Sequence, residues 1–277
     1  MHADLSVDFD GLRSVIELLT EAGVDALTPC AMTAEAETLS LDEHREVLRI
    51  TVEANAGRAV VYAGVGRPSI IETRELIAFA GEIGSDGLFV ITPFCNSYTK
   101  DEALRYYEDV AARTDLPVMI YNCPGYSGID LSPDDHRRLS SVANIVATKE
   151  GNQDQLQATV KATDGQMAVF TARDSYLLPS LEAGAVGVVS FAANVAPKLL
   201  VDLYAAAQSG DTVRAQELNE VLVPLVMALV SRSYPLMIKT AMGLVGLPAG
   251  PARRIEGGAT PEEVEALRRV IPTRLEA

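Results

Sequence analysis

Basic residues, cysteines and long apolar runs are all scarce in this 277-residue chain. The formal net charge is −15, and no stripe rich in lysine and arginine offsets it. Nucleic acids and anionic membranes would therefore be repelled. The longest apolar stretches, such as residues 221–230, are too short to span a bilayer, and residues 1–11 are acidic rather than signal-like. We expect a cytoplasmic protein that binds neither nucleic acid nor membrane.

Only three cysteines are present, Cys30, Cys95 and Cys123, which argues against a disulfide scaffold. Each lies at or just past the end of an apolar run, where the three could converge on a metal ion. Their spacing matches no zinc pattern, and no histidine joins them. The chain also lacks the glycine motifs that bind dinucleotides or nucleoside triphosphates. We therefore expect neither a metal nor an organic cofactor.

Short β-type runs alternate with helical patterns along most of the chain. The runs are rich in β-branched residues, as buried strands are, and lie at residues 25–30, 59–65, 87–92, 117–121, 144–149, 167–171 and 186–190. Between them, Ser40 and Glu43 predict a capping box, and Ser132 with Pro133 predicts another helix start. The repeat predicts an α/β fold of parallel strands and favours a closed (β/α)8 TIM barrel.

Seven strands are one fewer than such a barrel needs. A helical pattern begins almost at once, over about residues 8–22, where a strand should come first. We expect that the first β-strand is missing from this chain, or that the barrel closes in an unusual way. From about residue 197 onward the pattern is helical. We expect a barrel over residues 1–208 and a C-terminal appendage of three helices over residues 209–277.

Active sites of such barrels form at the carboxyl ends of the strands. Of five lysines, only Lys149 ends an apolar run. A lysine in dry surroundings loses its proton more easily, and a neutral amine can attack a ketone. The alternative is an ordinary ion pair with Glu150 or Asp174. Tyr121 ends the run 117–121 and could carry protons near Lys149, unless it is simply a core aromatic residue.

The loop at residues 31–35 follows the first run and contains small residues around Thr33. Such a loop exposes backbone N–H groups that can hold a carboxylate. The alternative is an ordinary connection between a strand and a helix.

Several segments together match one family. They are AGVDAL (22–27), TAEAETLSLDEHREVL (33–48), VYAGVG (61–66), YNCPGYSG (121–128), NIVATKEG (144–151) and LLPSLEAGAVGVVSFAANVAP (177–197). With these segments and its helical tail, the chain resembles the dihydrodipicolinate synthase / N-acetylneuraminate lyase family of class I aldolases over nearly its whole length.

The resemblance implies that Lys149 forms the Schiff base and that Tyr121 transfers protons. It also implies a homo-oligomer, either a dimer or a tetramer, without metal or organic cofactor. The substrate-binding residues that follow from it are Thr33, Met32, Ala34, Val189, Tyr126 and Cys95. Thr33 and neighbouring amides would bind the carboxylate of a keto acid, and Val189 would line the pocket through its backbone.

Three positions depart from the pattern of the synthase. Met32 replaces a hydroxyl residue that links tyrosines in a proton relay, and Cys95 replaces a tyrosine that reaches the neighbouring subunit. Tyr126 replaces an arginine that binds the second substrate, and a phenol cannot replace an arginine fork at equal strength. We therefore expect a divergent member rather than a true dihydrodipicolinate synthase.

The expected function is that of a Schiff-base lyase, an aldolase or dehydratase acting on a 2-keto acid such as pyruvate or a 2-keto-3-deoxy sugar acid. One alternative is a dihydrodipicolinate synthase-like condensing enzyme, and another is an inactive small-molecule-binding homologue. A metal-dependent aldolase that uses the cysteines is a third. The presence of both Lys149 and Tyr121 argues against loss of activity.

Overall fold

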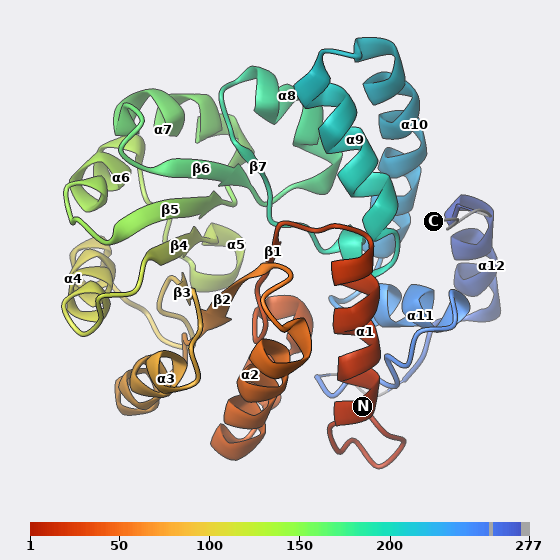
Figure 1. The fold of residues 1–277 in the computed structure, drawn as a ribbon, viewed down its shortest axis with the longest axis horizontal. Coiled ribbons are helices and arrows are strands. Elements are labelled where there is room, and N and C mark those ends of the chain that lie inside the picture. Colours follow the sequence, from red (N-terminus) through yellow and green to blue (C-terminus); the bar gives the residue numbers. More distant parts are fainter. Residues whose placement is uncertain (255–256, 273–277) are drawn as a thin grey trace. The chain divides into compact units, whose positions relative to one another are not determined.

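The computed structural model describes residues 1–254 and 257–272 (Figure 1). The chain forms two compact units, one of Met1–Val60 with Ser190–Ala277 and one of Val61–Val189. In the described part of the chain, no helix combines the length and the apolar character needed to cross a membrane. The predicted division into residues 1–208 and 209–277 stays a prediction, and its last residues, 273–277, lie outside the described residues.

Seven strands occur in the described residues, at the positions of the seven predicted runs. They are β1 (Ala26–Leu27), β2 (Val60–Gly64), β3 (Gly87–Ile91), β4 (Val118–Asn122), β5 (Ile145–Glu150), β6 (Ala168–Thr171) and β7 (Gly187–Val188). Strands β2 to β7 pair in chain order, and every pair is parallel. The predicted α/β fold with a parallel sheet is therefore confirmed. No strand precedes the first helix in the described residues.

Helices separate these strands in the second unit. They are α3 (Ile70–Glu82), α4 (Lys100–Ala111), α5 (Pro124–Ser127), α6 (Pro133–Ser140), α7 (Leu156–Thr163) and α8 (Leu177–Glu182). Every residue of β4 is buried, which explains why its sequence is a continuous apolar run rather than an alternating one. Helices α6 and α7 pack on each other and contact β5 and β6, respectively (Figure 1). One side of β5 therefore faces a helical layer.

The first unit contains one short strand, β1, and several helices. These are α1 (Phe9–Glu21), α2 (Leu41–Asn55), α9 (Pro197–Ser209), α10 (Thr212–Leu229), α11 (Leu236–Leu244) and α12 (Pro261–Val270). Ile16, Leu27, Ile50 and Ala59 form a buried cluster between α1, β1 and α2. Helix α9 packs along α10, which also contacts α11 and α12 (Figure 1). Helices α10, α11 and α12 lie at the three predicted helical stretches, and their description as a C-terminal appendage stays a prediction.

The predicted helix starts are confirmed by their capping contacts. At α2, the Glu43 amide donates to the Ser40 hydroxyl (3.1 Å), and the Ser40 amide donates to the Glu43 carboxylate (2.9 Å). Ser132 and Asp135 form the same reciprocal pair at α6, where Pro133 is the first helical residue. These contacts satisfy amide groups that the first turn of a helix leaves without intrahelical partners.

Replacement of the α2 cap should lower the stability of the protein. We expect Ser40→Ala to reduce the free energy of unfolding by about 1 kcal/mol, because the Glu43 amide loses its acceptor. Urea unfolding followed by circular dichroism measures the change. Ser14→Ala is the matched control, because Ser14 is an exposed residue within α1. An equal loss for both variants would contradict a specific capping role.

Candidate active site

Lys149 and Tyr121 lie directly opposite each other on neighbouring strands. In the register of β4 and β5, Tyr121 pairs with Lys149. Partners in a parallel pair share one face of the sheet, and the Lys149 Nζ atom is 4.4 Å from the centroid of the Tyr121 ring. Phe89 of β3 adds a second ring, which stacks on that of Tyr121 at 5.5 Å and lies 5.8 Å from Nζ. The amine therefore sits against an aromatic wall.

The surroundings of Lys149 favour its neutral form. Burial lowers the pKa of the Lys149 ammonium from its ordinary value to about 8, and electrostatic interactions with Asp174, the larger, and Cys123 oppose this shift. A desolvated ammonium loses hydration that an aromatic face replaces only in part. Lys149 thus holds a substantial fraction of neutral amine at mildly alkaline pH, which is the form that attacks a carbonyl carbon.

The two carboxylates considered as partners of Lys149 behave differently. Glu150 follows Lys149 on β5, and successive side chains on a strand point to opposite faces. Its carboxylate accepts hydrogen bonds from Asn122 and from the Asn152 amide. Asp174 is fully buried at the turn after β6, and its charge raises the pKa of Lys149. Of the two acids, Asp174 is the one that acts on the amine.

The backbone of Tyr121 is fixed by three donors. Its carbonyl oxygen accepts hydrogen bonds from the Thr92 amide (3.1 Å), the Thr92 hydroxyl (2.8 Å) and the Tyr107 hydroxyl (3.1 Å). Tyr107 is fully buried, and this burial raises the pKa of its phenol well above the ordinary value. Tyr107 is therefore a neutral donor that holds the end of β4 in place. Its role is not visible in the sequence, because Tyr107 lies within a helix rather than at the end of a strand.

The other predicted residues of the second unit lie at the carboxyl ends of strands or just beyond them. Tyr126 is in α5, and its ring lies 5.1 Å from that of Phe94. Cys95 is exposed, with a left-handed backbone conformation (φ 68°). Val189 follows β7, and its amide donates to the Thr171 carbonyl (3.1 Å). In the residues that the structure describes, no group of three or more His, Cys, Asp or Glu side chains is arranged to hold a metal ion.

The predicted carboxylate-binding loop belongs to the first unit. Thr33 lies in a short 3-10 helix, Met32–Ala34, and its hydroxyl is hydrogen-bonded to the hydroxyl of Tyr234. The amide of Ala34 donates to the Ala31 carbonyl (3.1 Å), so this predicted donor is engaged within the turn. Tyr234 also packs edge-on against Phe191. Sequence reasoning missed Tyr234, because it lies in the helical tail about 200 residues from the loop.

Glu35 anchors this loop within the same unit. It has a left-handed conformation (φ 52°) and is 1% exposed. Its carboxylate accepts hydrogen bonds from the amides of Arg253 (2.7 Å) and Arg254 (2.8 Å) and forms an ion pair with Lys239 (2.9 Å). The loop therefore takes its shape from residues near the far end of the chain.

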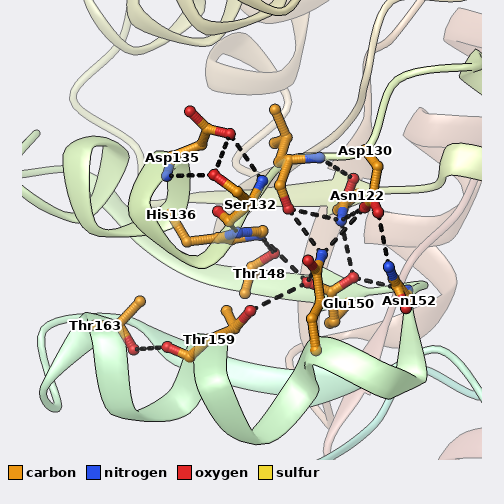
Figure 2. Close-up of polar contacts among 12 residues, drawn as sticks. Asn122, Asp130, Ser132, Asp135, His136, Thr148, Glu150, Asn152, Thr159 and Thr163 are labelled. Carbon is orange, nitrogen blue, oxygen red and sulfur yellow. Dashed lines mark hydrogen bonds and ion pairs between the residues drawn. The ribbon is translucent and has the colours of Figure 1, made fainter.

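A buried polar network lies around Glu150 in the second unit (Figure 2). Besides Glu150, Asn122 and Asn152, its members include Ser132, His136, Thr148 and Thr159. Burial raises the pKa of the Glu150 carboxyl to about 7, and hydrogen bonds from Asn152 and Asn122 oppose the shift. Burial also lowers the pKa of His136. Both groups therefore favour their neutral forms inside the protein.

The reactivity of Lys149 should report its lowered pKa. We expect the rate of acylation by a small anhydride to rise about 50-fold between pH 6 and pH 8 and to level off above pH 8, because the neutral fraction follows a pKa of about 8. Peptide mass spectrometry after brief labelling measures this rate. The exposed residue Lys161 is the internal reference. A Lys149 rate that keeps rising tenfold per pH unit beyond pH 9 would contradict this expectation.

The raised pKa of Glu150 predicts a pH-dependent stability. Between pH 4.5 and 7 the folded protein keeps a proton that the unfolded chain releases, so the free energy of unfolding falls as pH rises through this range. Glu150→Gln removes this dependence. We expect urea unfolding to show a gain for the variant relative to wild type, on the order of 2–3 kcal/mol, between pH 4.5 and 7.5. Glu182→Gln, at an exposed position of α8, should show no such trend. A pH-independent difference for Glu150→Gln would refute the assignment.

Comparison with known proteins places this site in context. A family model described as the dihydrodipicolinate synthetase family matches residues 1–273. A 4-hydroxy-tetrahydrodipicolinate synthase from Methanothrix thermoacetophila is 38% identical over 97% of this chain and 91% of its own length. One from Methanopyrus kandleri is 35% identical over 95% of this chain and 89% of its own length.

Solved structures show the same similarity. Dihydrodipicolinate synthase from Aquifex aeolicus has a TM-score of 0.90 at 34% identity, covering 96% of this chain and 92% of that one. The Acinetobacter baumannii enzyme, complexed with pyruvate, has a TM-score of 0.92 at 31% identity, covering 98% and 94%. The chain therefore belongs to the dihydrodipicolinate synthetase family of the class I aldolase superfamily, and it is an enzyme, a lyase that forms a lysine Schiff base.

Proposed function

We propose that the protein is an aldolase or dehydratase that acts on a 2-keto acid, such as pyruvate or a 2-keto-3-deoxy sugar acid, through a Schiff base on Lys149. The observation that carries this proposal is the pairing of Lys149 with Tyr121. An amine with a pKa of about 8 lies 4.4 Å from the ring of a tyrosine at the same level of the neighbouring strand. This arrangement supplies a nucleophile and a proton carrier together.

The chemistry follows from these two groups. The neutral amine of Lys149 attacks the keto carbon and forms a carbinolamine, which loses water to give an iminium ion. The positive nitrogen accepts electron density, so a carbanion at the neighbouring carbon is stabilised and a bond at that carbon can be broken or formed. Tyr121 moves the proton between the amine, the carbinolamine oxygen and the departing group.

We propose that the keto acid carboxylate is bound by Thr33 and by backbone amides at the start of its 3-10 helix, including that of Met32. The hydroxyl of Tyr234 supports this role, because its hydrogen bond orients the Thr33 side chain. Ala34 is the weakest of the predicted donors, since its amide is used within the turn. We propose Val189, Tyr126 and Cys95 as further substrate-binding residues.

A condensing reaction is the second candidate. The names of the curated relatives favour it, since they are 4-hydroxy-tetrahydrodipicolinate synthases. Tyr126 favours a different second reactant, because its ring packs on Phe94 and presents no positive charge to a second carboxylate. Together with Met32 and Cys95, Tyr126 supports a divergent member of the family whose second reactant is less anionic than that of the synthases.

The proposal also covers the architecture, assembly and location of the protein. We propose a (β/α)8 barrel with a C-terminal helical appendage, and TM-scores of 0.90 and above support this architecture. We also propose a cytoplasmic homo-oligomer, a dimer or tetramer, that needs neither a metal nor an organic cofactor.

Trapping of the Schiff base tests the function directly. We expect incubation with pyruvate and borohydride to add one reduced pyruvyl group to the peptide that contains Lys149. Lys149→Ala should abolish the adduct, whereas Lys161→Ala should retain it. Tyr121→Phe should slow adduct formation by about 100-fold or more, because proton transfer loses its carrier. No adduct with pyruvate or with a panel of longer keto acids would overturn the proposal.

Product analysis separates the candidate reactions. We expect cleavage or dehydration of a 2-keto-3-deoxy sugar acid, measured as release of the keto acid product, and no 4-hydroxy-tetrahydrodipicolinate. Formation of that product at a comparable rate would establish the condensing reaction instead. Activity that a chelator removes, without any borohydride-trapped adduct, would point to a metal-dependent aldolase.

A further inference from the structure

The two residues that carry the proposed chemistry are each followed by a buried polar residue. Asn122 follows Tyr121 on β4, and Glu150 follows Lys149 on β5, and both are fully buried. The register pairs Tyr121 with Lys149 and Asn122 with Glu150. Because side chains alternate along a strand, the second pair lies on the opposite face of the sheet, immediately behind the first.

A direct hydrogen bond joins the two rear residues. The Asn122 side-chain amide donates to the Glu150 carboxyl group at 2.8 Å. The Asn122 side-chain oxygen accepts a hydrogen bond from the Leu131 backbone amide at 3.1 Å. The Glu150 oxygen that faces Asn122 also accepts one from the Asn152 backbone amide, at 2.7 Å. This bond connects β4 to β5 in addition to the hydrogen bonds of the sheet.

A second acid extends the connection. Asp130 accepts from the side chains of Asn122 (3.0 Å), Asn152 (2.7 Å) and Gln155 (3.1 Å). Gln155 also donates to Glu150, at 3.2 Å. The side chains of Asn122 and Gln155 thus each donate to both acids, and Asn152 donates to Asp130 through its side chain and to Glu150 through its backbone amide. These contacts tie together β4, β5 and the segment after each of them, as Figure 2 shows for the labelled members. We refer to Asn122, Glu150, Asp130, Asn152 and Gln155 as the rear clamp.

Helices α6 and α7 close the rear clamp from outside. From α6, His136 is held by the Ser132 carbonyl (3.0 Å) and the Thr148 hydroxyl (3.2 Å), and its ring nitrogen lies 3.7 Å from the Glu150 carboxyl group. From α7, the Thr159 hydroxyl donates to Glu150 at 3.4 Å. Glu150 and Asn122, which are fully buried, thus have their polar groups enclosed by protein.

The main chain is equally constrained at this point. The Gly151 amide donates to the Asn122 carbonyl at 2.8 Å. A Cβ atom on Gly151 would lie 2.5 Å from that carbonyl oxygen, a non-bonded contact closer than Cβ atoms make in proteins. The strand ends therefore approach each other as closely as a residue without a side chain allows, directly after Asn122 and Glu150.

We propose that Asn122 and Glu150 are positioning residues that fix the placement of the Tyr121 phenol relative to the Lys149 amine through the rear clamp. This inference rests on the proposed function. A buried polar network is favourable only when its groups are satisfied together, so it selects one arrangement of the strand ends. Proton transfer and carbonyl attack depend on such placement, and a shift of about 1 Å costs roughly 100-fold in rate.

Four variants test this role. Glu150→Met keeps the side-chain length but removes every acceptor, and Asn122→Leu removes the donor. Glu150→Gln keeps an acceptor for Asn122 and for the Asn152 amide. Thr163→Val is the matched control, because Thr163 is a buried polar residue of α7 whose hydroxyl bonds only to backbone carbonyls nearby. The measurement is the rate of borohydride-trapped pyruvate adduct formation at saturating pyruvate, with the concentration for half-saturation recorded separately.

We expect Glu150→Met and Asn122→Leu to slow adduct formation by about 10- to 100-fold without a matching change in half-saturation. Glu150→Gln should stay within about threefold of wild type, and Thr163→Val should not differ from it. The double variant should be slowed by less than the product of the two single effects, because both changes break the same Asn122–Glu150 bond. If Glu150→Met does not yield folded protein, Asn122→Ser breaks the same bond with a smaller change in volume.

Two failures can be told apart. A wild-type protein that forms no adduct with any keto acid overturns the proposed function and the positioning role with it. A wild-type protein that forms the adduct, with Glu150→Met and Asn122→Leu at the wild-type rate, overturns the positioning role alone. Slowing that tracks the loss of unfolding free energy, including an equal effect in Thr163→Val, also overturns it, since it would show a general structural effect.

Discussion

The register between β4 and β5 is the constraint on which the site depends. One pairing sets Tyr121 against Lys149 on one face and Asn122 against Glu150 on the other. A shift by one residue would exchange the two faces and place an acid among the aromatic rings and an amine among the amide donors. One register between β4 and β5 therefore serves both the apolar part of β4, which is buried on both faces, and the polar residues at its end.

The two faces of β5 treat ionisable groups in opposite ways. Lys149 faces aromatic rings, which are weaker hydrogen-bond acceptors than the water they replace, so desolvation lowers its pKa. Glu150 meets a set of hydrogen-bond donors, yet burial still raises its pKa to about 7. Burial favours the neutral form of both side chains. Its cost is offset by the charge of Asp174 at Lys149 and by amide donors at Glu150.

Much of this architecture could be predicted from single residues and their spacing. Apolar runs located all seven strands, and Ser40 with Glu43 located a helix start, because these are local effects of side chain and backbone. Lys149 could be recognised in the sequence because a cation at the end of a buried strand is costly, and such a residue often has a functional role. The partners of these residues were not predictable in the same way. Phe89, Tyr107 and Tyr234 are ordinary aromatic residues in sequence, and only the packing of distant segments brings Tyr107 to the Tyr121 carbonyl or Tyr234 to Thr33.

The anchoring of Glu35 has a consequence for the order of events during synthesis. Its buried carboxylate is satisfied by amides of Arg253 and Arg254 and by Lys239, which the ribosome adds more than 200 residues later. Until then the Glu35 carboxylate lacks these three partners, and its burial away from water would be costly. The loop around Thr33 thus reaches its final form only after Lys239, Arg253 and Arg254 have been synthesised. In a nascent chain, the loop that contains Thr33 and Glu35 would still lack these contacts when the strands β2 to β7 had already been synthesised.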